Sequence, residues 1–85
     1  MLDMVLFVST LLAQNWIVQF SRDIEKEEVI ITCTRMYKDN SISVVHYCDF
    51  SSYVNWTELL DWVQDEYAHM KELIDRDDKG GESHG

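Results

Sequence analysis

The chain has 85 residues, of which 46% are hydrophobic, and its 16 acidic and 7 basic residues give a net charge of −9 at pH 7. A chain of this length forms one domain, with no room for a second domain or a deep cofactor cleft. Because a strongly acidic protein repels phosphate groups, the charge argues against direct binding to nucleic acid or to an anionic membrane surface. It favours a basic partner, with a general role in solubility as the alternative.

Residues 2–14 are predicted to form a short helix. Its packing face is expected to consist of Met4, Val5, Val8, Leu11 and Leu12. Leu2, Leu6 and Phe7 widen the apolar arc beyond what one packing face needs. The wide arc predicts either deep burial or a second contact, such as a homodimer. A β-strand over the letters MVLFV is the alternative for the first part of this segment.

Three strands are predicted next, at residues 15–21, 28–37 and 41–50. The first alternates, and the other two are rich in β-branched and aromatic residues. We expect Asp39 and Asn40 to form a two-residue turn between the last two strands, because both residue types tolerate positive φ. That turn sets Cys33 opposite His46. The charged loop 22–27 joins the first two strands, so the three strands form an antiparallel meander.

The last element is predicted to be a helix from about Asn55 to Arg76. Its core-facing seam is expected to contain Trp56, Leu60, Val63, Tyr67, Met70 and Ile74, which recur at alternating spacings of four and three. Residues 77–85 are polar and contain all three glycines, so we expect a flexible tail. The prediction is a single α+β domain over residues 1–76, with the order α-β-β-β-α and both helices packed on one face of a three-stranded antiparallel sheet.

The predicted sheet places Cys33, His46 and Cys48 on one face, which raises the question of a zinc site or a nucleophile. A structural zinc site needs four ligands, and the sequence has no C-x-x-C pair and no second histidine near these three residues. A Cys33–His46 nucleophile–base pair would lack an orienting third residue. No glycine-rich phosphate loop is present. We therefore predict no catalytic, metal or cofactor-binding residues and a protein that is not an enzyme.

The two cysteines do not form a disulfide framework, which favours a reducing compartment. The N-terminal stretch MLDMVLFVSTLL has no basic residue and contains Asp3, unlike a secretory signal peptide. It is also too short to span a bilayer. These features predict a cytoplasmic location without membrane attachment.

The last helix carries the candidate partner-binding surface. Glu58, Asp61, Asp65 and Glu72 fall on one side of it, away from the seam. Trp62 lies among these carboxylates, and it either covers the edge of the core or serves as an interface anchor. Together with the 22–27 loop and the turn, they are expected to form one acidic surface. The predicted partner-binding residues are Glu58, Asp61, Trp62, Asp65, Glu66, Glu72 and Asp39.

The α-β-β-β-α layout over residues 2–76 and the acidic charge resemble small phage-encoded inhibitors of host defence, in particular anti-CRISPR proteins. The double-stranded RNA-binding domain shares the element order, but the stretch NWTELLDWVQDE would repel RNA. The resemblance implies a DNA-mimicking inhibitor that blocks a basic groove of a host nucleic-acid-binding protein, with a Cas effector as the leading partner. A subunit that dimerises through the N-terminal helix is the second hypothesis, and an enzyme that uses Cys33 and His46 is the third.

Overall fold

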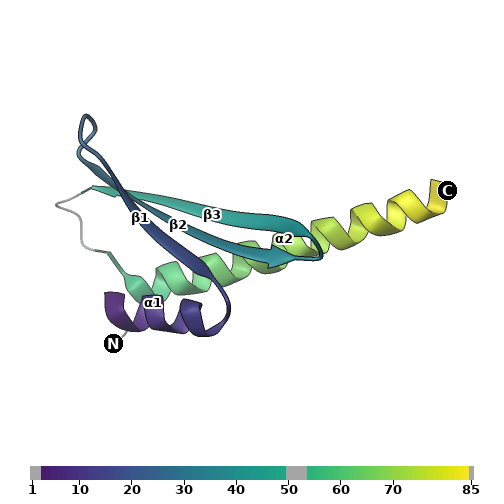
Figure 1. The fold of residues 1–85 in the computed structure, drawn as a ribbon, viewed down its shortest axis with the longest axis horizontal. Coiled ribbons are helices and arrows are strands. Elements are labelled where there is room, and N and C mark those ends of the chain that lie inside the picture. The colour runs from purple at the N-terminus through teal and green to yellow at the C-terminus, as the bar shows by residue number, and fades with distance from the viewer. Residues whose placement is uncertain (1–2, 50–53, 85) are drawn as a thin grey trace.

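The computed structural model describes residues 3–49 and 54–84 and has the element order α1, β1, β2, β3, α2. Figure 1 shows a three-stranded sheet with both helices on one side of it. The elements are α1 (Met4–Ala13), β1 (Ile17–Asp23), β2 (Glu28–Tyr37), β3 (Asn40–Asp49) and α2 (Trp56–His84). The sheet is antiparallel with the strand order β1-β2-β3. This confirms the predicted α+β fold.

Helix α1 begins and ends with well-formed caps. The Asp3 side chain accepts a hydrogen bond from the Leu6 amide at 2.9 Å, which satisfies one of the free N–H groups of the first turn. At the other end the Asn15 amide donates to the Leu12 carbonyl and the Trp16 amide donates to the Leu11 carbonyl, with Asn15 in the left-handed region at φ 68°. This Schellman motif stops the helix and brings Trp16 and Leu11 into the core.

The β2–β3 turn corrects the predicted register. The two turn residues are Lys38 and Asp39, with φ values of 48° and 66°, rather than Asp39 and Asn40. The Asn40 side-chain amide instead donates to the Lys38 carbonyl at 3.0 Å. Cys33 therefore lies opposite Val44, and His46 lies opposite Ile31. A shift of two residues keeps every side chain on its predicted face, so the hydrophobic pattern alone cannot detect it.

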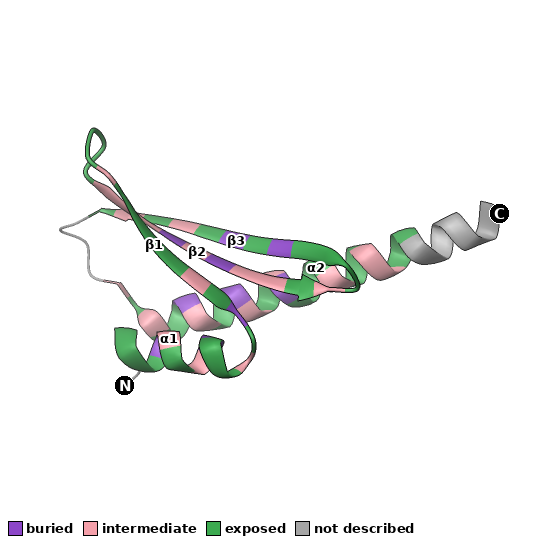
Figure 2. Ribbon diagram, viewed as in Figure 1, coloured by how far each residue is buried: buried purple, intermediate pink, exposed green. Residues whose placement is uncertain are grey.

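The core lies between the sheet and the two helices. It consists of Phe7, Leu11, Trp16, Ile31, Cys33, Ile42, Val44, Leu59, Val63 and Tyr67. Figure 2 shows the buried residues where the helices and the sheet meet, while much of the outward surface is exposed. The rings of Trp16 and Tyr67 meet edge to face at 5.1 Å between centroids. The Trp16 indole nitrogen is buried without a hydrogen-bond partner in the described part of the chain.

The predicted packing face of α1 is only partly correct. Phe7 and Leu11 are completely buried, whereas Met4, Val5 and Leu12, which were assigned to that face, are about half exposed or more. Phe7 packs against the Trp56 ring at 5.1 Å, so its position fixes the rotation of α1 against α2. Since nearly every residue of α1 is apolar, the sequence alone could not select the rotation.

Helix α2 also departs from its prediction in two respects. Leu59 is buried with Val63 and Tyr67, while Met70, which was assigned to the seam, is 39% exposed. The helix continues to His84, so the end predicted near Arg76 is wrong. Adding a residue to an existing helix costs far less than starting one, which allows α2 to run on through two glycines.

Candidate partner-binding surface

The first half of α2 presents an acidic face with no lysine or arginine. Asn55 starts the helix by accepting a hydrogen bond from the Glu58 amide at 3.1 Å. Glu58, Asp61 and Asp65 are all exposed, as predicted, and the positions 56–70 contain no lysine or arginine. The buried residues of the helix lie on its opposite side. The fold therefore holds these carboxylates toward solvent on a rigid element.

Trp62 lies at the edge of this face and has one side packed and one side open. It is 39% exposed, and its ring meets the His46 imidazole edge to face at 5.9 Å between centroids. This contact attaches the acidic face of α2 to strand β3. Both predicted roles for Trp62 are therefore compatible with its position, because the ring covers the sheet edge and still offers surface to a partner.

A hollow of about 600 Å³ opens beside Trp62, between the end of β3 and the start of α2. It is lined by Glu28, His46, Tyr47, Cys48, Asp49, Val54, Asn55, Glu58, Leu59 and Trp62. Three of these lining residues are acidic and two, Tyr47 and Trp62, have large aromatic side chains. Such a combination suits a cationic group with an apolar stem, because carboxylates pair with the charge and aromatic faces attract it.

Glu28 and Asp49 are site residues that the sequence analysis missed. They are direct cross-strand partners, and Glu28 also pairs with Asp23 on β1, so three acidic residues form one row across the end of the sheet. Like charges placed opposite each other in a sheet repel, so the row is unfavourable for folding. Only the observed register pairs Glu28 with Asp49, because the predicted turn placed Glu28 opposite residue 51.

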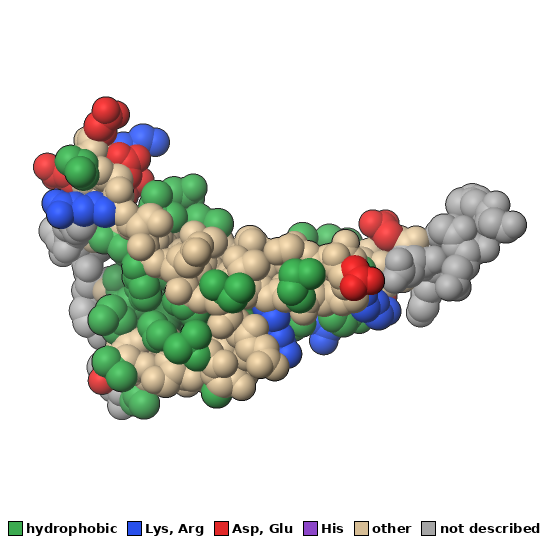
Figure 3. Space-filling model, viewed as in Figure 1, with side chains coloured by type: hydrophobic (Ala, Val, Ile, Leu, Met, Phe, Trp, Pro, Cys, Tyr) green, Lys and Arg blue, Asp and Glu red, His purple; other side chains and the backbone are tan. Residues whose placement is uncertain are grey.

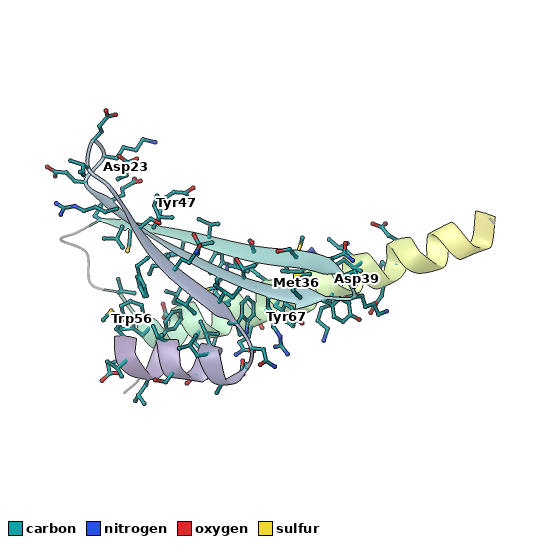
Figure 4. All side chains as sticks on the ribbon, viewed as in Figure 1. Asp23, Met36, Asp39, Tyr47, Trp56 and Tyr67 are labelled. Carbon is teal, nitrogen blue, oxygen red and sulfur yellow. The ribbon has the colours of Figure 1, made fainter. Side chains whose placement is uncertain are left out.

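Two predicted site residues lie apart from this acidic face. Glu72 forms an ion pair with Arg76 at 2.9 Å, one helical turn further along. Asp39 lies at the tip of the β2–β3 hairpin, where the neighbouring Lys38 binds Asp75 of α2 at 2.7 Å. Figure 4 places Asp39 and Asp23 at opposite ends of the sheet. The 22–27 loop and the turn therefore do not join α2 in one continuous acidic surface, and basic groups offset the charge near Asp39 and Glu72.

The cysteines and histidine of the sheet face do not form a reactive pair. Burial raises the pKa of the Cys33 thiol from 9.0 to about 11, so the thiol is protonated at neutral pH. Burial, followed by the charges of Asp49 and Glu28, also raises the pKa of Cys48. Within the described ranges, no three His, Cys, Asp or Glu side chains are grouped so as to hold a metal ion.

Comparisons with protein-family models, with curated proteins and with solved structures found no match to this chain. Over residues 3–49 and 54–84, no helix combines the length and the apolar character needed to cross a membrane.

Proposed function

We propose that this protein is a non-enzymatic binding protein that docks the first half of α2 into a basic groove of a nucleic-acid-handling protein. The observation that carries the proposal is the acidic face of Glu58, Asp61 and Asp65, which is exposed, lies on a regular helix and contains no lysine or arginine. Such a face attracts a basic groove from a distance and orients the encounter. Once docked, it occupies the groove and excludes nucleic acid from it.

The spacing of the carboxylates supports imitation of a phosphate backbone. From Glu58 to Asp65 the helix rises about 10 Å, at about 1.5 Å per residue. The three exposed carboxylates of the acidic face lie within that rise, which corresponds to about one charge per 5 Å. One strand of duplex DNA carries a phosphate for about every 3.4 Å of axis, so the two linear charge densities are of the same order. A basic groove that binds a nucleic-acid strand would therefore contact a comparable series of negative charges on α2.

The hollow beside Trp62 gives the acidic face an anchoring point. An arginine or lysine side chain from the partner fits its chemistry, with Glu58 near the charge, the Trp62 ring beside the stem, and Glu28 and Asp49 at the strand ends adding negative charge nearby. Interfaces derive most of their energy from a few residues of this kind, in which tryptophan is enriched. The proposal therefore assigns the central contact to Trp62 and the steering to the surrounding carboxylates.

The resemblance in layout and charge makes a Cas effector the first partner to test. In that case the protein would be phage-encoded and would act in the cytoplasm of the host cell. The protein would compete for the groove in which the effector reads the protospacer-adjacent motif of its DNA target. Other basic nucleic-acid-binding enzymes of a host present the same kind of groove, and a panel of such proteins should be tested in parallel.

The test is competition with duplex DNA for the candidate effector, measured by fluorescence anisotropy of labelled DNA. We expect the wild-type protein to displace DNA, and Glu58→Lys/Asp61→Lys/Asp65→Lys to lose at least tenfold in apparent affinity. A matched control is Glu25→Lys/Glu27→Lys/Asp39→Lys, which reverses three exposed acidic residues elsewhere and changes the net charge equally. Equal competition by both triple variants would contradict the proposed face, since only total charge would then matter.

The anchoring role of Trp62 is tested separately. Trp62→Ala should lower the affinity at least tenfold, because it removes the aromatic wall of the hollow. Leu73→Ala is the matched control, since Leu73 is also 39% exposed on α2 but does not line the hollow. Equal effects of the two substitutions would show that the hollow is not the centre of the interface.

A further inference from the structure

Helix α1 lies on the surface and yet has the composition of a buried helix. Its ten residues include no charged side chain. Phe7 and Leu11 turn inward and are fully buried, whereas the exposed fractions of four other apolar residues range from 48% to 66%. These residues are Met4, Val5, Leu6 and Leu12. A helix that is apolar on all sides normally has a packing partner on each of them.

The outward side of α1 is shaped for contact with another helix. At about 100° per residue, Val5, Ser9 and Leu12 lie opposite the buried pair Phe7 and Leu11. Ser9 is small, so a second helix can approach closely between Val5 and Leu12. The hydroxyl of Thr10 donates to the Leu6 carbonyl at 2.7 Å, so it does not depend on water for its hydrogen bond. Figure 3 shows hydrophobic side chains gathered over α1 and between α1 and the sheet.

We propose that the outward side of α1 binds α1 of a second copy of this chain, in a symmetric dimer. A two-fold axis brings the same patch of both copies together, so the patch must complement itself. An uncharged apolar helix is self-complementary, because two copies of α1 in contact bring no lysine, arginine or glutamate into the interface. A basic partner would instead be drawn to the acidic face of α2, which is the separate surface of the proposed function.

The available area is sufficient for a weak dimer. Val5, Leu6 and Leu12, the exposed apolar residues away from the buried side of α1, each offer roughly 80–100 Å² of apolar surface. Two copies would then bury roughly 500–600 Å² of apolar surface, below the value of about 1,000 Å² at which specific, stable interfaces begin, so the dimer is expected to be weak. We therefore expect weak association, with a dissociation constant on the order of 10⁻⁴ M.

Salt dependence separates this interface from the proposed function. Two chains of net charge −9 repel each other, so added salt should strengthen a dimer held by an uncharged patch. Docking of the α2 face into a basic groove should instead weaken as salt is added. Failure of one proposal therefore leaves the other intact.

The experiment is sedimentation equilibrium of the full chain between about 5 and 500 µM, at low salt and at about 0.5 M NaCl. We expect a monomer–dimer equilibrium that tightens with salt, and at least tenfold weaker association for Val5→Glu. Val5 lies in the first turn, where a carboxylate favours the helix dipole, so the variant should still fold. The matched control is Met36→Glu, which adds the same charge at a residue of similar exposure on the uncovered sheet face.

A monomer throughout the concentration range at high salt would overturn the proposal. It would also be overturned if Val5→Glu associated like the wild type, or if Met36→Glu weakened association as much as Val5→Glu did. Circular dichroism of both variants establishes that each is folded. If Val5→Glu does not fold, Leu6→Glu takes its place, and the same outcomes apply.

Discussion

Asp61 provides a test of the acidic face that needs no knowledge of the partner. Asp61 lies three residues after Glu58 and four residues before Asp65, so it is next to two like charges on the helix surface. Asp61 lies beyond the first turn of α2, where the helix dipole adds little. Asp61→Lys replaces both repulsive pairs by attractive ones, and we expect this substitution to stabilise the protein.

The expected gain follows from the two pairs. A like-charge pair at this spacing costs about 0.2–0.5 kcal/mol and an opposite pair contributes about the same, so each reversed pair changes the free energy of unfolding by about 0.4–1 kcal/mol. Two pairs give a gain of about 1–2 kcal/mol at low salt. Asp61→Asn removes the repulsion without adding attraction and should give about half of that gain. Salt screens exposed charges, so the gain should shrink strongly in 1 M NaCl, where the screening length is about 3 Å.

The measurement is urea unfolding followed by circular dichroism at low and high salt. The control is Asp77→Lys, which makes the same change in net charge at another exposed position of α2. Its neighbours at three and four residues, Leu73, Ile74, Gly80 and Gly81, are all uncharged. The reasoning would be refuted if Asp61→Lys were no more stable than Asp77→Lys, or if its gain persisted in 1 M salt. A more stable variant that no longer binds would show that the face costs stability and serves recognition.

Three further predictions concern the fold and its chemistry. Because the pKa of Cys33 is raised from 9.0 to about 11, the unfolded thiol ionises first, and stability should fall by about 2–3 kcal/mol between pH 9 and 11. Cys33→Ala should remove that part of the pH dependence in urea unfolding, and an unchanged dependence would contradict the assigned burial. Phe7→Ala should cost about 3–5 kcal/mol in the same assay, because it empties a fully buried site against Trp56, and a loss below about 1 kcal/mol would contradict the packing of α1. Asn55→Ala should cost about 1 kcal/mol by removing the cap on the Glu58 amide, whereas Asn55→Asp should retain most of the stability.

The order of the elements and the acidic character of α2 follow from local patterns. The β-branched runs predict β2 without error and β3 to within one residue, and alternation predicts which side chains share a face of the sheet. The exposure of Glu58, Asp61 and Asp65 follows from their angular distance from Val63 and Tyr67 on the helix. These features depend on residues close together in the chain, so the sequence expresses them directly.

Register, rotation and charge pairing depend on contacts between distant residues. The two-residue turn at Lys38 and Asp39 sets the register of β2 and β3. The hydrophobic pattern could not distinguish this register from the one shifted by two residues. The same register forms the row that contains Glu28 and Asp49. The Phe7–Trp56 contact decided which side of α1 is buried.

The sequence by itself thus determined which elements form and where the acidic face of α2 lies, because periodicity and charge are local properties. The tertiary structure decided which acids gather around Trp62, which are offset by basic groups, and which apolar side of α1 remains open. Those outcomes depend on how elements far apart in sequence pack, and several packings bury nearly the same apolar surface.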